Sequence, residues 1–295
     1  MHTHSHSSRR QNIQLVLWVN LAFSLIELIG GVLTHSMAVL SDALHDLGDS
    51  FALILSLYME KVAERKRDAV FSFGYKRFSL LAALINGVIL LVGSGLILSQ
   101  AIPRIFSPVP VHTDGLLALA VLGILVNGWA ALRLQKGKSS NEAMLSWHLL
   151  EDVLGWVAIL IMGIAMKFGD FPFLDPLLSI AFAALIIWNA FKNVKKVLRV
   201  FLQSIPDDVD LKIIESKLCE HPLIVSVHDT HVWSLDGEYH VLTAHVVVAA
   251  LASNQEITAL KSQVRKQMEA LSIEHTTLEI EYENDCCPST YYCND

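Results

Sequence analysis

Six long apolar blocks occupy the first two thirds of the chain, and shorter apolar runs follow them. Each block has about the 20 residues that an α-helix needs to cross a bilayer. They cover approximately residues 13–34, 36–58, 78–101, 115–134, 143–167 and 173–191. The first is too long for the apolar region of a signal peptide and lacks a small-residue cleavage site. The pattern therefore predicts six transmembrane helices.

The pattern changes after about Gln203, where charged residues become frequent and apolar residues alternate with polar ones. Alternation predicts strands and helical spacing predicts helices. The expected order is helix 209–220, strand 224–234, strand 239–249, helix 254–272 and strand 276–283. We therefore predict a tail (1–12), a transmembrane domain (13–202), a soluble α+β domain of order αββαβ (203–285) and a second tail (286–295).

Composition and charge support a membrane protein and predict its orientation. The chain is 53% hydrophobic and 17% charged, whereas soluble domains carry about 25% charged residues. Of the 22 Lys and Arg residues, fifteen lie in the N-terminal segment, in the second-to-third and fourth-to-fifth loops and just after the sixth block. Because such residues stay in the cytoplasm, both termini and the soluble domain are predicted to be cytoplasmic. The net charge of -7 makes nucleic acid an unsuitable partner.

The second predicted helix carries ionisable residues on one face. The run SDALHDLGDS places Asp42, His45, Asp46 and Asp49 at steps of three and four. One Asp at the centre of a spanning helix costs roughly 2.5 to 3.5 kcal/mol, so such residues are functional candidates. Glu27 in the first helix is instead expected near the outer interface, with its side chain reaching water, and is given no role.

The fifth predicted helix repeats the spacing, with His148 and Asp152 four residues apart. At about 1.5 Å rise per residue, the two His-x-x-x-Asp pairs overlap in depth. Two imidazoles and two carboxylates suit tetrahedral zinc, with cadmium, cobalt, nickel and iron behind it. Each pair is alternatively a buried His–Asp hydrogen bond that holds helices together, and Asp42 and Asp46 either line the path or face a solvated cavity.

The sequence also bears on the class of protein. No phosphate-binding G-x-x-x-x-G-K-[ST] loop occurs, so ion gradients would supply the energy, and protons are the natural exchanged ion. A b-type cytochrome with His45 and His148 as haem ligands is the alternative. An intramembrane metalloprotease would need H-E-x-x-H, which does not occur.

Three stretches carry a family resemblance. The runs HSMAVLSDALHDLGDS, FSFGYKRFSLLAALING and HLLEDVLG resemble the cation diffusion facilitators, specifically the zinc-transporting branch of bacterial zinc and cadmium exporters. The resemblance implies a six-helix homodimeric transporter, not an enzyme, in the cell membrane (the inner membrane of a Gram-negative cell). It assigns the metal ligands to His45, Asp49, His148 and Asp152.

The resemblance departs from some relatives in the loops. No histidines follow the second helix in KVAERKRDAVFSFGY, and the fourth-to-fifth loop is only QKGKSSN. The accessory metal sites that relatives hold there should be absent.

The resemblance also implies a ferredoxin-like cytoplasmic domain that binds regulatory zinc and helps to form the dimer. Its ligands would correspond to His228, His245 and Glu281. All four cysteines belong to the predicted cytoplasmic part, where thiols stay reduced. The two tails offer either a defined metal site or weak scavenging, through Cys286, Cys287, Cys293, His2, His4 and His6.

Overall fold

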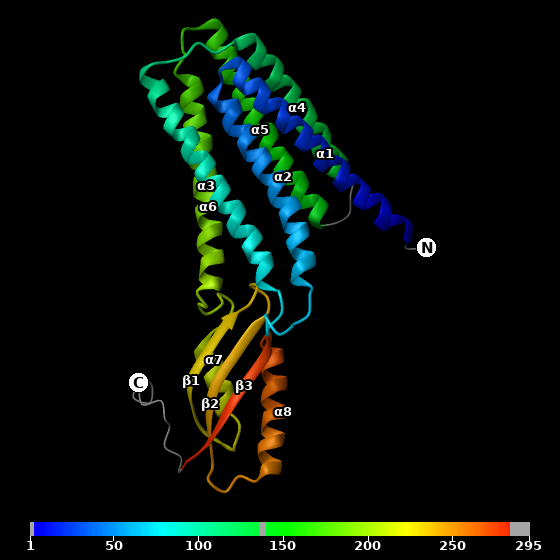
Figure 1. The fold of residues 1–295 in the computed structure, drawn as a ribbon, viewed down its shortest axis with the longest axis vertical. Helices are drawn as coiled ribbons and strands as arrows, with labels where there is room; N and C mark the ends of the chain where they lie inside the picture. Colours follow the sequence, from blue (N-terminus) through cyan, green and yellow to red (C-terminus); the bar gives the residue numbers. More distant parts are fainter. Residues whose placement is uncertain (1–2, 136–139, 284–295) are drawn as a thin grey trace. The chain divides into compact units, whose positions relative to one another are not determined.

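The structure is a computed structural model that describes residues 3–135 and 140–283, with side chains for residues 15–135 and 145–283. The chain divides into two compact units. The first comprises Met1–Met59 and Ala82–Val194, and the second comprises Glu60–Leu81 and Lys195–Asp295. Long helices make up the first unit, and the second contains a three-stranded sheet (Figure 1).

The long helices are α1 (Thr3–Thr34), α2 (Met37–Ala63), α3 (Arg77–Phe106), α4 (Thr113–Gln135), α5 (Ser140–Phe168) and α6 (Leu174–Phe201). Five of these six, within the described residues, are long and apolar enough to cross a membrane. The exception is α2, whose 27 residues include the aspartates predicted to be functional. Large apolar side chains such as Ile29, Leu125 and Leu185 are exposed, as expected on surfaces that face lipid. The chain is therefore a multi-pass membrane protein.

Several helices extend beyond the apolar blocks from which they were predicted. α1 begins at Thr3 instead of residue 13, and α6 continues to Phe201 instead of ending at residue 191. The apolar block measures only the part of a helix that lies in hydrocarbon, whereas backbone hydrogen bonding continues through polar residues. The predicted ends were therefore wrong by up to ten residues, although each helix is present.

The beginning of α2 is fixed by a carboxylate from α6. Asp175 accepts hydrogen bonds from the backbone N–H of Met37 (2.8 Å), the backbone N–H of Ala38 (3.3 Å) and the Ser36 hydroxyl (2.5 Å). A negative group satisfies the free N–H groups at a helix N-terminus and is attracted by the helix dipole. Residues 37–50 that follow are buried or half-buried, so the polar face of α2 lies within protein instead of lipid.

A glycine allows α4 and α5 to pack closely. A Cβ added at Gly123 would lie 2.3 Å from a ring atom of Trp156, which is fully buried and packs against Phe23 of α1 with ring centroids 5.7 Å apart. The indole therefore fills the space between α1, α4 and α5.

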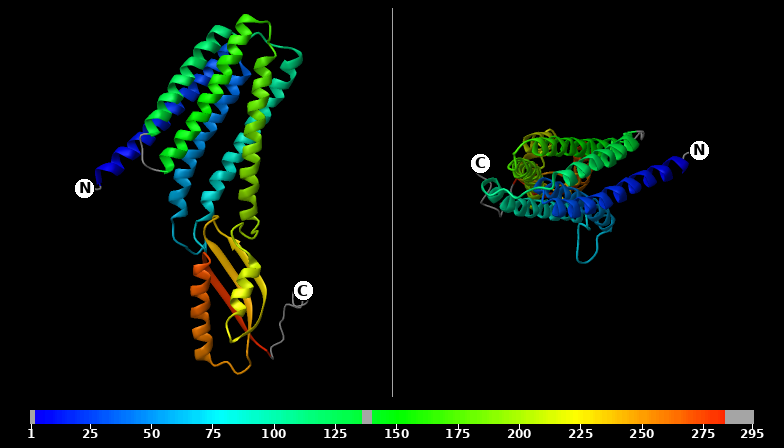
Figure 2. Two further views of the ribbon diagram at one scale, coloured as in Figure 1. Left: turned by 180° about the vertical axis from the view of Figure 1, so that it is seen from behind. Right: turned by 90° about the horizontal axis from the view of Figure 1, so that it is seen from above.

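The second unit has the predicted order of elements: α7 (Leu211–Cys219), β1 (Ile224–Ser234), β2 (His240–Val248), α8 (Asn254–Ala270) and β3 (Ile273–Tyr282). The sheet order is β1-β2-β3, with β1 antiparallel and β3 parallel to β2. Helices α7 and α8 cover the same face of the sheet (Figure 2), where Leu218, Val246 and Leu260 are fully buried. The helical membrane domain and the ferredoxin-like αββαβ domain are thus confirmed.

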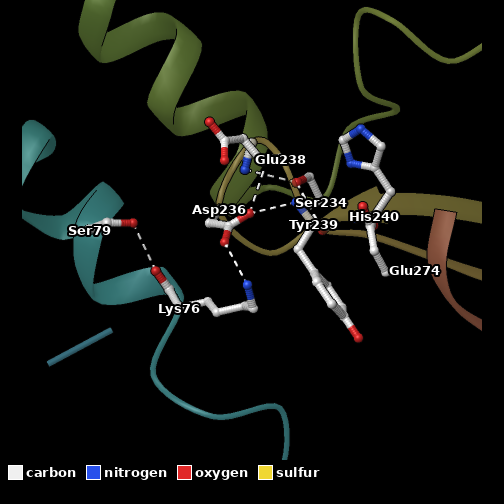
Figure 3. Close-up of polar contacts among 9 residues, drawn as sticks. Lys76, Ser79, Ser234, Asp236, Glu238, Tyr239, His240 and Glu274 are labelled. Atoms are coloured by element: carbon white, nitrogen blue, oxygen red, sulfur yellow. Dashed lines mark hydrogen bonds and ion pairs between the residues drawn. The ribbon is translucent and has the colours of Figure 1, made fainter. Parts of the chain in front are cut away.

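The turn between β1 and β2 is held by Asp236 (Figure 3). Its carboxylate accepts hydrogen bonds from the backbone N–H groups of Glu238 (3.0 Å) and Tyr239 (2.7 Å), and Lys76 Nζ lies 3.3 Å away. Gly237 within the turn has a φ of +98°, a conformation that favours glycine. Partial burial raises the pKa of Asp236, but these hydrogen bonds and the Lys76 charge outweigh burial, so the pKa is lowered.

Candidate metal centres

Helices α2 and α5 bring two imidazoles to one carboxylate. Asp49 Oδ2 lies 2.8 Å from His148 Nε2 and 3.7 Å from His45 Nε2. The two imidazole rings are 5.8 Å apart between centroids and nearly perpendicular. One ligand atom from each of the three residues lies within 4.8 Å of the others. The half-buried side chains thus form a compact set of nitrogen and oxygen donors.

The separations between these donor atoms suit a small tetrahedral ion. Zinc binds nitrogen and oxygen at about 2.0 to 2.2 Å, so neighbouring donors of a tetrahedron lie about 3.3 to 3.6 Å apart. The Asp49 carboxylate lies at 2.8 and 3.7 Å from the imidazoles of His148 and His45, on either side of that value. All three donors also lie within 4.8 Å of one another, so they are close enough together to share one ion.

Asp152 lies beside this cluster but outside it. It is one helical turn beyond His148 on α5, its side chain is 6% exposed, and its Oδ2 has no hydrogen-bond partner among the described residues. It is close enough to interact electrostatically with His148 and Asp49. The structure thus brings three of the four predicted ligands together and leaves Asp152 adjacent, with a free oxygen.

Three further carboxyl groups are buried near the cluster. Asp42 and Asp46 on α2 are 8% and 1% exposed, and Glu27 on α1 is 0% exposed. The expectation that Glu27 reaches water was wrong. The position of Glu27 along α1 sets its height in the membrane, but it does not reveal which face of the helix packs inward, here towards Trp156.

The sheet of the second unit holds another set of potential ligands. His228 on β1 and His245 on β2 are direct cross-strand partners, and Glu281 lies on β3. The Glu281 carboxylate lies 2.7 Å from His245 Nδ1 and 3.4 Å from His228 Nε2. One ligand atom from each residue falls within 4.8 Å of the others. The three residues implied by the family resemblance therefore meet on one face of the sheet.

Two carboxylates that sequence analysis did not single out also approach this set. Asp229 Oδ2 and Glu279 Oε2 each lie 3.5 Å from His245 Nε2. Asp229 occupies an irregularity in β1, with a φ of 48°. Simple strand alternation would have placed it on the opposite face from His228, so only the bulge brings it to the site.

Other histidines of this unit have different partners. His231 lies 2.8 Å from Asp229, and the buried His240 lies 3.3 Å from Asp208. His275 packs edge-on against Phe73.

None of the predicted ligands in the two tails has a described side chain, and most of them lie outside the described residues. Those outside are His2, Cys286, Cys287 and Cys293, while His4 and His6 lie in α1 without described side chains.

The geometry of the membrane cluster bears on the cytochrome alternative. A haem bound by His45 and His148 would need its porphyrin between the two imidazoles. The Nε2 atoms that would bind the iron lie instead 2.8 Å (His148) and 3.7 Å (His45) from the Asp49 carboxylate. The site thus favours a small ion.

Known proteins resemble this chain over nearly its whole length. Residues 13–202 match the model of the cation efflux transmembrane domain, and residues 206–283 match that of the cation efflux protein cytoplasmic domain. The chain is 32% identical to a "Cadmium, cobalt and zinc/H(+)-K(+) antiporter" of Bacillus velezensis, over 95% of this chain and 91% of that protein. It is 33% identical to "Zinc transporter ZitB" of Escherichia coli, over 96% and 91%, and 31% identical to "Metal cation efflux system protein CzcD" of Cupriavidus metallidurans, over 95% and 89%. The chain therefore belongs to the cation efflux, or cation diffusion facilitator, family of membrane transporters.

Proposed function

We propose that this protein exports zinc from the cytoplasm in exchange for protons, through a membrane site formed by His45, Asp49, His148 and Asp152. The observation that carries the proposal is the approach of the Asp49 carboxylate to two imidazoles from different membrane helices, at 2.8 Å (His148) and 3.7 Å (His45). Relatives named for transport of zinc, cadmium and cobalt support the choice of ion. Cadmium, cobalt, nickel and iron are secondary candidates, because a mixed nitrogen and oxygen site also accepts them.

Exchange with protons follows from the chemistry of the ligands. Imidazole binds metal only when it is neutral. An ordinary imidazole titrates near pH 6.5, so its protonation changes within the physiological pH range. Protonation of His45 or His148 would remove a ligand and release zinc on the more acidic side. Carboxylates alone would respond only at lower pH. The antiporter named among the relatives supports coupling to protons.

The C-terminal domain would bind a second, regulatory zinc through His228, His245 and Glu281. Their donor atoms lie within 4.8 Å of one another, and Asp229 offers a further oxygen next to His245. We assign this domain to the cytoplasm, together with both termini, from the distribution of Lys and Arg. The cytoplasmic-domain model that residues 206–283 match carries the short name ZT_dimer, which refers to dimerisation and supports a homodimer.

Transport by purified protein in proteoliposomes tests the exchange. Zinc should enter vesicles against its gradient when the pH gradient favours proton exit, and the flux should collapse when an ionophore dissipates that gradient. Asp152→Ala should abolish the flux by removing the fourth ligand. Zinc flux that is indifferent to the pH gradient, in protein that still binds zinc at the membrane site, would disprove the exchange and leave the metal site intact.

A further inference from the structure

The buried carboxyl group of Glu27 has no role in either metal centre. Glu27 is 0% exposed, and both its oxygens lack a hydrogen-bond partner within the described residues. It belongs to neither of the two groups of potential metal ligands found there. An isolated ionised carboxylate is costly in such surroundings, so the group needs either a proton or a cation.

The neighbours of Glu27 do not supply a fixed cation. Among the residues with described side chains, the charged groups that act on it are all acidic: Asp42 and Asp46 on α2 and Asp152 on α5. Helix α4, which also packs against α1, carries no ionisable residue between Asp114 and Arg133. The remaining neighbour is Trp156, whose indole N–H faces the carboxyl group as an uncharged donor and therefore supplies no cation. Several carboxylates of like charge cannot all ionise cheaply in one buried site, which favours a proton over a bare charge.

Glu27 also lies between the membrane metal site and one end of the bundle. Helices α1 and α2 meet through a tight turn at His35, which has a φ of 59°. With a rise of about 1.5 Å per residue, Glu27 lies about 10 Å before the end of α1, whereas Asp49 lies about 18 Å beyond the start of α2. Glu27 is therefore about 8 Å closer to that end than Asp49.

We propose that Glu27 carries the exchanged proton between the membrane metal site and the end of the bundle where α1 meets α2. This rests on the proton exchange proposed above and names a residue for it. The Glu27 carboxylic acid passes its proton towards the ligands as zinc leaves, and the resulting carboxylate takes a proton from water at that end. The carboxyl group returns to its starting state, and no other bond changes. A carboxyl oxygen is suited to this because it accepts and donates a proton at the same atom.

Glu27→Gln in the full-length protein, reconstituted in vesicles, tests the proposal. Gln keeps the shape of Glu but cannot exchange a proton. Two fluxes are measured: zinc-driven proton movement with a trapped pH dye, and exchange of isotopic zinc for zinc at equal pH. We expect the proton flux to fall about a hundredfold, the lower end of the range for loss of a positioned proton-transfer group. Zinc self-exchange, which needs no proton, should stay within about twofold because the metal site is separate.

The matched control is Glu60→Gln, which makes the same change at an exposed position near the other end of α2 and should leave both fluxes unchanged. If Glu27→Gln does not fold, Glu27→Asp keeps the carboxyl group and should retain zinc-driven proton flux. Loss of proton flux in Glu27→Asp together with intact zinc self-exchange would overturn the proposal.

The remaining outcomes separate this proposal from the one on which it rests. If the unsubstituted protein moves zinc without protons, the exchange itself fails, and the role of Glu27 fails with it. If the unsubstituted protein exchanges protons and Glu27→Gln does so equally well, only the role of Glu27 is refuted. An equal fall in zinc self-exchange and proton flux would show that Glu27 contacts the metal or supports the fold, which also refutes it.

Discussion

Asp49→Asn is expected to weaken zinc binding at the membrane site more than any other conservative change of the cluster. One oxygen of Asp49 lies 2.8 Å from His148 Nε2 and 3.7 Å from His45 Nε2. It is therefore the one metal-ligand atom of the cluster that lies close to both imidazole nitrogens. Asn preserves the shape of the side chain but removes its negative charge. An amide oxygen is a much poorer ligand for zinc than a carboxylate.

The size of the effect follows from the number of ligands. Zinc bound by four protein ligands in small peptides has an apparent binding free energy of about 10 to 16 kcal/mol, which is about 2.5 to 4 kcal/mol for each ligand. Since about 1.4 kcal/mol is a tenfold change, the Kd should rise roughly 60- to 700-fold. The helices should remain folded, because the half-buried Asn can still accept a hydrogen bond from His148.

The assay is competition for zinc between the full-length protein and a fluorescent chelator. A background carrying His228→Ala and His245→Ala removes the C-terminal site, so only membrane binding is measured. Glu60→Gln is the control, because Glu60 also lies on α2 and carries a negative charge, but it is exposed and outside the three-ligand cluster. Its Kd should stay within about threefold of the background, as expected for separate sites. Equal weakening by both substitutions would refute the assignment, since a general loss of negative charge would then explain the effect.

Three other changes test the packing, the second metal centre and the turn. Gly123→Ala would place a Cβ 2.3 Å from Trp156 and should destabilise the membrane domain by about 1 to 3 kcal/mol, measured by thermal unfolding. Gly95→Ala is the control and should not destabilise it, because no described atom lies within 4 Å of the added Cβ. His245→Ala removes one of the three proposed ligands of the C-terminal site, so the full-length protein should lose about one equivalent of bound zinc in equilibrium dialysis. An unchanged stoichiometry would rule out the C-terminal site. Hydrogen bonds and a neighbouring positive charge lower the pKa of Asp236 in the folded state. The stabilising contribution of Asp236 should therefore be present above the ordinary carboxyl pKa and disappear as the pH falls through the lowered value. Asp236→Asn should abolish that part of the acid dependence of the melting temperature.

The spacing of ionisable residues is what predicts the membrane cluster. His45 and Asp49 lie one turn apart, which places them on one face of a helix whatever the rest of the protein does. That His148 on α5 would meet them depended on matched depth, and in the structure these three side chains approach one another. The distance to Asp152 depends on the rotation of α5 about its own axis, which spacing within one helix does not determine.

Other features depend on tertiary packing that no local pattern records. Glu27 is buried because α1 turns that face towards Trp156, and the apolar residues around it look alike on every side of α1. Asp229 reaches His245 through a bulge in β1, and alternation assumes a regular strand. Asp175 is another case, because its contact with the start of α2 spans more than 130 residues of chain.

That contact explains how a helix too polar to pass as a membrane span is held inside the bundle. Asp175 satisfies the first N–H groups of α2 and so fixes one end of the helix to α6. The site is therefore built from one helix anchored in this way and from α5, which contributes His148 across a single 2.8 Å contact. A shift of α5 along α2 by one helical turn, about 5.4 Å, would take His148 out of reach of Asp49. Zinc favours the arrangement in which both helices contribute ligands, whereas protonation of His148 removes its capacity to bind metal. Zinc and protons would therefore stabilise different positions of α5. That difference is the condition under which a proton gradient can drive zinc transport.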